Sequence, residues 1–114
     1  MTKDLDEITA RTVSRAGLAP DELDREVKSL GARWSIANNE LCLQLRGAPM
    51  AKCGAAVAQA AKIADEMDHH PRIVVEYAGT TLTIHTHDKQ AVTMLDLVYA
   101  ARVERWLRDN GWEL

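Results

Sequence analysis

Phenylalanine is absent from this sequence of 114 residues, and tryptophan and tyrosine together make up only 4% of it. Aliphatic residues and methionine must therefore fill any core, because hydrophobic residues still account for 46% of the chain, as in an ordinary globular protein. Cysteine is also scarce. Cys42 and Cys53 match neither a zinc knuckle nor a CxxC redox pair, so we interpret them as reduced packing residues.

The sequence lacks both a basic excess and a long apolar run. With a net charge of −3, it has no excess of basic residues that could bind a phosphate backbone, so nucleic acid is not an expected partner. No stretch approaches the ~20 apolar residues that span a bilayer, and the start of the chain has no signal-peptide core. We therefore expect a cytoplasmic protein that has no membrane partner.

Hydrophobic periodicity predicts three helices and two β-hairpins. Apolar residues recur at steps of three and four in the helical segments, and they alternate with polar residues in the strands. The expected helices are 21–30, 49–67 and 92–106, and the expected strands are 33–37, 41–45, 73–77 and 82–84. The predicted fold class is α+β, a four-stranded antiparallel sheet with helices on one face and the order α-β-β-α-β-β-α.

The length of the chain suits one domain and is too short for two. We assign residues 20–114 to that domain and residues 1–19 to an N-terminal extension, whose residues 2–16 form a weak helix or a mobile arm. A four-stranded sheet leaves unpaired edges, which natural proteins usually cover. We therefore expect a homo-oligomer.

The four histidines of the chain are His69, His70, His85 and His87. If Ala78-Gly79 forms a two-residue turn, Val75 pairs with Leu82, and His70 pairs with His87 at the open end of the hairpin. The same register pairs Arg72 with His85, and a three-residue loop with a bulge would move it by one residue. Imidazole ionises near neutral pH, so such a cluster suits acid–base catalysis.

These residues carry a resemblance to a known family. The run of Asp65, His69-His70-Pro71, Tyr77, His87-Asp88 and Asp96 resembles the pterin-4a-carbinolamine dehydratases, and the likeness spans about residues 23–103. Members of that family dehydrate 4a-hydroxytetrahydropterins to quinonoid dihydropterins without metal or cofactor, and they assemble as dimers or tetramers. The resemblance therefore implies a pterin substrate, no cofactor, and a dimer or tetramer.

The resemblance also implies roles for individual residues. The expected catalytic residues are His69, His70 and His87, and the expected supporting residues are Pro71, Asp88 and Asp96. Within this set we assign proton transfer to His69 and His87, and we assign the holding of the pterin to His70. Ile73 stands where the family commonly has an aromatic residue, so we assign it to substrate binding together with His70.

Other interpretations stay open beside this one. Some relatives with this fold have lost pterin activity and act as assembly factors for carboxysomal Rubisco. Because this chain lacks aromatic residues that usually line the pocket, a pterin-inactive binding or assembly protein is the alternative function. His85-Thr86-His87 also offers zinc ligands, but no ligand spacing demands the metal, so we expect none. His85 itself is interpreted as a solvated strand residue, and Asp88 as an alternative cap of the last helix.

Overall fold

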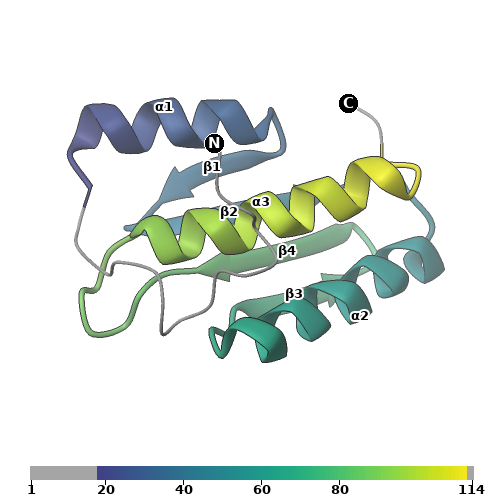
Figure 1. The fold of residues 1–114 in the computed structure, drawn as a ribbon. Coiled ribbons are helices and arrows are strands. Elements are labelled where there is room, and N and C mark those ends of the chain that lie inside the picture. The colour runs from purple at the N-terminus through teal and green to yellow at the C-terminus, as the bar shows by residue number, and fades with distance from the viewer. Residues whose placement is uncertain (1–17, 113–114) are drawn as a thin grey trace.

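The order of elements agrees with the prediction from the sequence. The computed structural model describes residues 18–112, and its helices and strands are α1 (Pro20–Leu30), β1 (Trp34–Ala37), β2 (Glu40–Leu45), α2 (Met50–Met67), β3 (Arg72–Glu76), β4 (Gly79–Ile84) and α3 (Met94–Asp109) (Figure 1). The α+β class and the order α-β-β-α-β-β-α are therefore confirmed. The arm expected over residues 2–16 lies outside the described residues.

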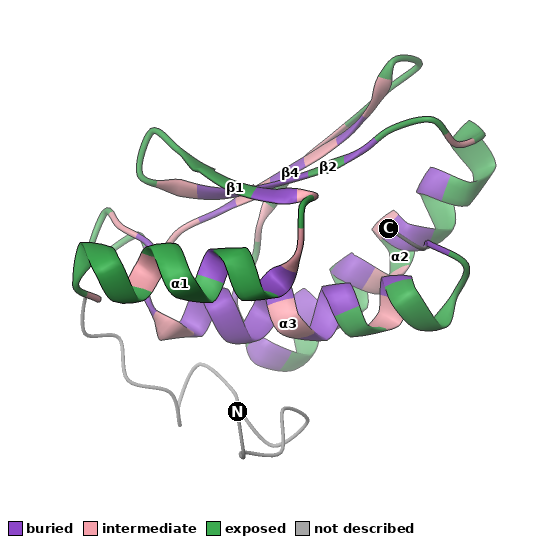
Figure 2. Cartoon of the chain, turned by 90° about the horizontal axis from the view of Figure 1, so that it is seen from above, coloured by how far each residue is buried: buried purple, intermediate pink, exposed green. Residues whose placement is uncertain are grey.

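The strands form one antiparallel sheet in the order β1-β2-β4-β3, which leaves β1 and β3 at its edges. Seen from above, the strands lie on one side and the three helices of residues 18–112 on the other, so the helices cover a single face (Figure 2). Leu41 pairs with Ile84 and Leu43 with Leu82 across the central strands, and these four side chains are buried. The inner face of the sheet and the helices thus enclose an aliphatic core.

Helix α2 shows how a core without phenylalanine is packed. Its buried face consists of Cys53, Ala56, Ala60, Ile63, Ala64 and Met67. These side chains are mostly small, so α3 can approach closely, and the buried hydroxyl of Tyr99 on α3 donates to the Ala60 carbonyl at 2.8 Å. Burial raises the pKa of Tyr99, which keeps the hydroxyl protonated as a donor.

A buried carboxylate on α3 fastens the first hairpin. Glu104 accepts hydrogen bonds from Arg33 at 2.8 and 3.1 Å, from the indole of Trp34 at 2.9 Å and from Arg108 at 2.6 Å. Burial by itself would raise the pKa of Glu104, but the hydrogen bonds from these three residues and the charge of Arg33 outweigh it, so the pKa lies below its ordinary value of 4.5. The ionised carboxylate thus holds the start of β1 against α3.

The turn of the first hairpin places Glu40 at the beginning of β2. Asn38 and Asn39 both have positive φ, at 54° and 62°, and Ala37 pairs with Glu40 across them. Two consecutive left-handed residues form a type I′ turn, for which asparagine is favoured and which matches the twist of a hairpin. The hairpin expected from the sequence is therefore present.

The turn of the second hairpin differs from the prediction. Glu76 pairs with Gly79, so the turn is Tyr77-Ala78 and not Ala78-Gly79. Gly79 lies in β4 with φ of 151°, where a Cβ would meet the carbonyl oxygen of Leu45 on β2 at 2.9 Å. The glycine therefore permits a close approach of two strands and is not needed for the turn itself.

This correction moves the strand pairing by two residues. Ile73 pairs with Leu82 and not with Ile84, and Val75 pairs with Thr80 and not with Leu82. Arg72 likewise pairs with Thr83 and not with His85. The expected pairing of His70 with His87 is wrong for the same reason. Because the shift is even, each side chain keeps the face of the sheet that its alternation predicted.

Candidate active site

The end of α2 sends the two adjacent histidines into different environments. Asp68 closes the helix in the left-handed conformation, with φ of 54° and ψ of 46°. His69 is then buried, with 7% of its side chain exposed, whereas His70 is exposed and its Nε2 lies 2.9 Å from Oδ1 of Asp65. An exposed pair such as His70 and Asp65 contributes little to stability, and it leaves the His70 ring accessible to a ligand.

The buried ring of His69 is hydrogen-bonded to Asp96 in the first turn of α3. Its Nε2 lies 2.5 Å from Oδ1 of Asp96, which is fully buried. The other oxygen, Oδ2, accepts from the Thr93 N–H at 2.8 Å and from the Thr86 hydroxyl at 2.9 Å. Since an ionised carboxylate only accepts hydrogen bonds, Nε2 of His69 is the donor, and Nδ1 is the ring nitrogen that the carboxylate does not hold.

The start of α3 explains why a carboxylate can be buried at this point. Thr93 is the N-cap residue, and Asp96 at the third helical position bonds back to its N–H in a capping box. The positive end of the helix dipole also favours a negative charge in the first turn. These local terms offset part of the desolvation cost of Asp96.

Thr86 connects this carboxylate to the segment that carries the other two histidines. It is fully buried between His85 and His87 in the chain, and its hydroxyl lies 2.8 Å from that of Thr93 as well as bonding Asp96. Its N–H also bonds the carbonyl of Ala91 at 2.9 Å, which closes the loop before α3. A continuous path of hydrogen bonds therefore runs from the end of α2, through Asp96, to the segment after β4.

His85 and His87 line a hollow of about 320 Å³ on the surface, which we call the polar hollow. Its lining residues are Asn38, Asn39, Glu40, His85, His87 and Gln90. The two imidazole rings have centroids 4.5 Å apart and planes at 61°, and Nδ1 of His85 lies 3.5 Å from Oε2 of Glu40. His69 and His70 are not among the residues that line the polar hollow.

The remaining residues singled out from the sequence lie around these groups. Pro71 is half-buried between His70 and β3, and Asp88 is exposed directly after His87. Ile73 on β3 is half-buried and lines a small internal gap with Leu82. The interpretation of Asp88 as the cap of the last helix is wrong, because Thr93 takes that position.

Sequence reasoning missed three residues of this region. Thr86 and Thr93 complete the hydrogen bonds of Asp96, and Glu40 stands beside His85. The Thr93-x-x-Asp96 spacing is a capping-box pattern and could have indicated the contact between Thr93 and Asp96. His85 is half-buried beyond the end of β4, with 26% of its side chain exposed, and is not a solvated residue within that strand.

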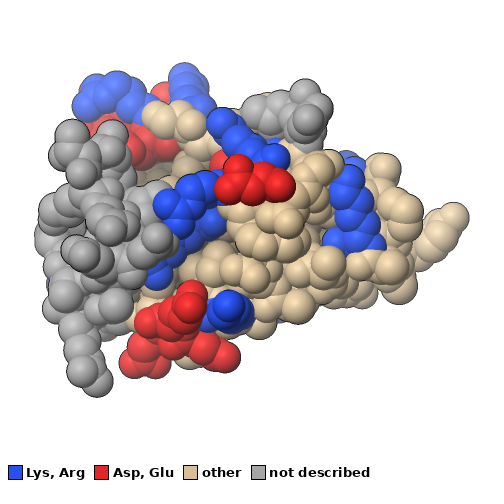
Figure 3. Space-filling view, turned by 45° about the vertical axis from the view of Figure 1, so that its right-hand side comes forward, with Lys and Arg blue, Asp and Glu red and all other residues tan. Residues whose placement is uncertain are grey.

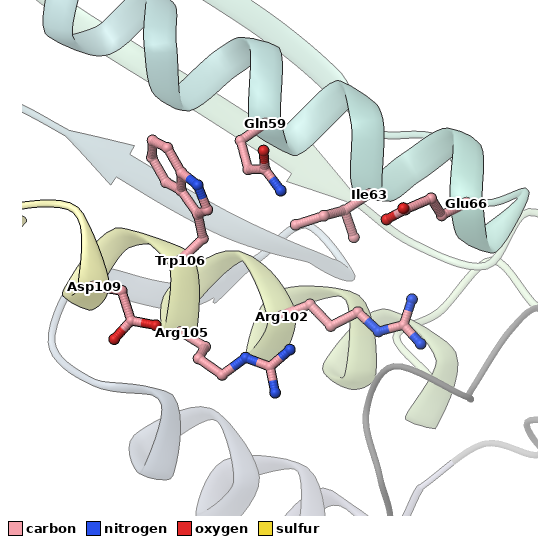
Figure 4. A pocket seen from close by; sticks show the side chains of 7 residues that line it. All are labelled: Gln59, Ile63, Glu66, Arg102, Arg105, Trp106 and Asp109. Carbon is pink, nitrogen blue, oxygen red and sulfur yellow. The ribbon is translucent and has the colours of Figure 1, made fainter.

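A larger hollow, of about 420 Å³, lies between α2 and α3 and contains none of the histidines. Gln59, Ile63 and Glu66 line it from α2, and four residues line it from α3 (Figure 4). The side chains from α3 are Arg102, Arg105, Trp106 and Asp109. Two cationic and two acidic residues offset one another here, so this hollow shows no preference for a ligand of either charge.

The face of the molecule in Figure 3 carries charges of both signs. On the face that Figure 3 shows, Lys and Arg side chains are interspersed with Asp and Glu. Within residues 18–112, no three side chains of His, Cys, Asp or Glu are grouped so that they could hold a metal ion. In the same span, no helix combines the length and apolar character needed to cross a membrane.

The fold and the hydrogen-bond network define a class, a small α+β domain with a buried histidine–carboxylate pair. Residues 16–106 match the family model described as pterin 4 alpha carbinolamine dehydratase. Because this match covers most of the chain, the protein belongs to that family.

Individual relatives agree with the family match. A protein of Metallosphaera sedula is 31% identical over 87 residues, which cover 76% of this chain and 90% of the relative. A protein of Streptomyces coelicolor is 32% identical over 95 residues, which cover 82% of this chain and 93% of the relative. Both names assign pterin-4-alpha-carbinolamine dehydratase activity only provisionally.

A solved structure supports the fold. The crystal structure of a transcriptional coactivator/pterin dehydratase from Brucella melitensis matches with a TM-score of 0.72 and 24% identity. The match covers 79% of this chain and 97% of that chain, so the two proteins share the architecture over nearly all of the Brucella protein.

Proposed function

We propose that this protein dehydrates 4a-hydroxytetrahydropterins to quinonoid dihydropterins, with His69, His70 and His87 as its catalytic histidines and no cofactor. Membership of the dehydratase family supports a hydro-lyase reaction. The observation that carries the proposal is the hydrogen-bonded path from His69 through Asp96 to Thr86. This path ties the first histidine segment to the backbone that bears His87.

The reaction needs two proton transfers and no change of oxidation state. A base removes the proton from N5 of the pterin, the N5 electron pair forms a double bond to C4a, and the C4a–O bond breaks. An acid delivers a proton to the departing oxygen, which leaves as water. The site therefore has to supply one group that accepts a proton and one that donates a proton.

His69 is suited to one of these transfers because Asp96 fixes its proton. With Nε2–H donated to the carboxylate at 2.5 Å, the free nitrogen is Nδ1, which can take a proton. The carboxylate then stabilises the imidazolium that forms. His87, on the wall of the polar hollow, supplies the complementary transfer.

The other assigned residues support these two. His70 is exposed beside Asp65, and we assign it to holding the pterin. Pro71 keeps His70 extended at the end of α2, and Asp88 supports its neighbour His87. The role of Ile73 in substrate binding stays a prediction, since its half-buried side chain faces an internal gap.

The direct test follows the dehydration of a 4a-hydroxytetrahydropterin by ultraviolet absorbance with purified full-length protein. We expect acceleration above buffer, and a loss of about 10²- to 10⁴-fold in His69→Ala and in His87→Ala, the range typical of removing a general acid or base. Lys62→Ala, on the exposed side of α2, is the matched control and should keep the wild-type rate. A wild-type rate equal to that in buffer would refute the proposal.

One observation favours the alternative, a pterin-inactive binding or assembly protein, for example for carboxysomal Rubisco. The lining of the polar hollow includes no Phe, Tyr or Trp, so a flat bicyclic ring finds little area for stacking beside His87. A folded wild-type protein that does not accelerate dehydration would favour this second function.

We also propose that the protein is a cytoplasmic dimer or tetramer. The edge strands β1 and β3 leave backbone groups without a strand partner in the described chain, and natural proteins usually cover such edges. Size-exclusion chromatography with light scattering measures the assembly directly. A monomer at micromolar concentration would contradict this part of the proposal.

A further inference from the structure

Two side chains without a role so far line the polar hollow together with His87. They are Glu40 at the start of β2 and His85 directly after β4. The rings of His85 and His87 meet edge to face with centroids 4.5 Å apart, and Nδ1 of His85 lies 3.5 Å from Oε2 of Glu40. The three side chains thus form a row on the wall of the polar hollow, with His85 in the middle.

The backbone explains why these side chains share one wall. Thr86 is buried in an isolated bridge with Ala91, and its two neighbours in the chain, His85 and His87, both line the hollow. Glu40 reaches this wall because the next residue, Leu41, pairs with Ile84, the residue before His85. The row is therefore set by the register of the two central strands.

The carboxylate of Glu40 and the partial burial of both side chains favour one orientation of the His85 ring. The side chains of His85 and Glu40 are 26% and 35% exposed, so neither is freely solvated. A carboxylate next to Nδ1 favours the proton on that nitrogen, and this selects one orientation of the His85 ring. The ring of His85 in turn packs edge to face against the ring of His87.

We propose that Glu40 and His85 are positioning residues of the dehydratase site. Glu40 orients the ring of His85, and His85 holds the imidazole of His87 toward the polar hollow. The kinetic part of this inference rests on the proposed function, whereas the orientation of His87 can be measured without turnover.

The kinetic test compares Glu40→Gln and His85→Ala with Glu76→Gln, a matched control at an exposed carboxylate on β3. We expect each of the first two variants to lower kcat roughly tenfold, less than removal of His87, and to leave KM within about twofold. Adding Glu40→Gln to His85→Ala should cause no further loss, because Glu40 acts through His85. Losses that multiply, or a wild-type kcat in either single variant, would overturn the proposal.

A second readout uses the Cε1–Hε1 NMR signal of His87, assigned by its disappearance in His87→Gln. This signal should shift in Glu40→Gln, because the orientation of His85 is lost, and it should stay in place in Glu76→Gln. If the wild type does not accelerate dehydration but this shift occurs, the proposed function fails and the positioning row stands. An unchanged His87 signal in Glu40→Gln overturns the inference whatever the rates are.

Discussion

The substitution Asp96→Asn exchanges one carboxylate oxygen for an amino group and leaves the size of a fully buried side chain unchanged. The asparagine carbonyl can keep the two hydrogen bonds from Thr86 and from the Thr93 N–H, which now meet at Oδ2. Its amino group then faces Nε2 of His69. Because an amino group only donates, His69 has to move its proton to Nδ1 and accept at Nε2.

The structure predicts a small loss of stability and a large loss of activity. A hydrogen bond to a charged group contributes roughly 1.5–3 kcal/mol and a neutral one roughly 0.5–1.5 kcal/mol, so the exchange should lower the free energy of unfolding by about 1–2 kcal/mol. The dehydration rate should fall by about 10²- to 10⁴-fold, because Nδ1 of His69 is already protonated and cannot accept a proton.

Asp96→Ala is the contrasting variant. It leaves His69, Thr86 and the Thr93 N–H without their acceptor, so it should cost about 3 kcal/mol or more. Urea unfolding and the absorbance assay measure both quantities on the same preparations. A wild-type dehydration rate in Asp96→Asn, or an unfolding cost equal to that of Asp96→Ala, would refute the reasoning about the tautomer of His69.

Two further outcomes concern stability. Because folding lowers the pKa of Glu104, its carboxylate stabilises the protein above the ordinary pKa of 4.5, and this contribution is lost as pH falls through the lower folded pKa. The free energy of unfolding, measured with urea, should therefore fall more steeply from about pH 6 to about pH 3 in the wild type than in Glu104→Gln. An equal dependence on pH in the two proteins would contradict this. Gly79→Ala should lower the free energy of unfolding by about 1 kcal/mol or more, because a Cβ meets a carbonyl oxygen at 2.9 Å. Gly54→Ala in α2, where a Cβ meets nothing within 4 Å, should raise the free energy of unfolding by roughly 0.5–1 kcal/mol. If the urea midpoints of both glycine variants lay above that of the wild type, or both below it, the argument would be wrong.

The helices and strands could be predicted because burial of each element follows its own period. The limits of this signal appear at the element ends. The last helix was expected from residue 92 because Val92 is apolar, and Val92 is indeed buried, but Thr93 is the cap and the helix begins at Met94. Periodicity therefore indicates which side chains are buried and does not indicate where the backbone becomes helical.

The predicted register of the second hairpin was wrong because a glycine can serve either in a turn or at a close approach of two strands. Gly79 was interpreted as a turn residue from its place between two apolar runs. Its actual constraint is the carbonyl oxygen of Leu45, which belongs to a strand far away in the sequence. No local pattern contains that information, since it depends on which strand pairs with β4.

The candidate site shows the same division between local and distant information. The position of Asp96 in the first turn of a helix could be predicted from its spacing to Thr93. Its contact with His69 spans 27 residues and depends on how α2 ends and packs against α3. The contact of Glu40 with His85 likewise depends on the register between β2 and β4, so His85 was interpreted as solvated.

A buried histidine–carboxylate pair needs an explanation other than stability. The side chains of His69 and Asp96 are 7% and 0% exposed, and a well-packed apolar pair of similar volume is often as stable as a buried polar pair that contains a charge. The N-terminus of α3 offsets part of the cost of burying the charge, but it does not require a histidine opposite. What the pair adds is a fixed proton on Nε2 at the point where the two histidine-bearing segments are joined. An acid–base site needs that property and a packed core does not, so the catalytic hypothesis centres on the buried His69 and not on the more accessible His70.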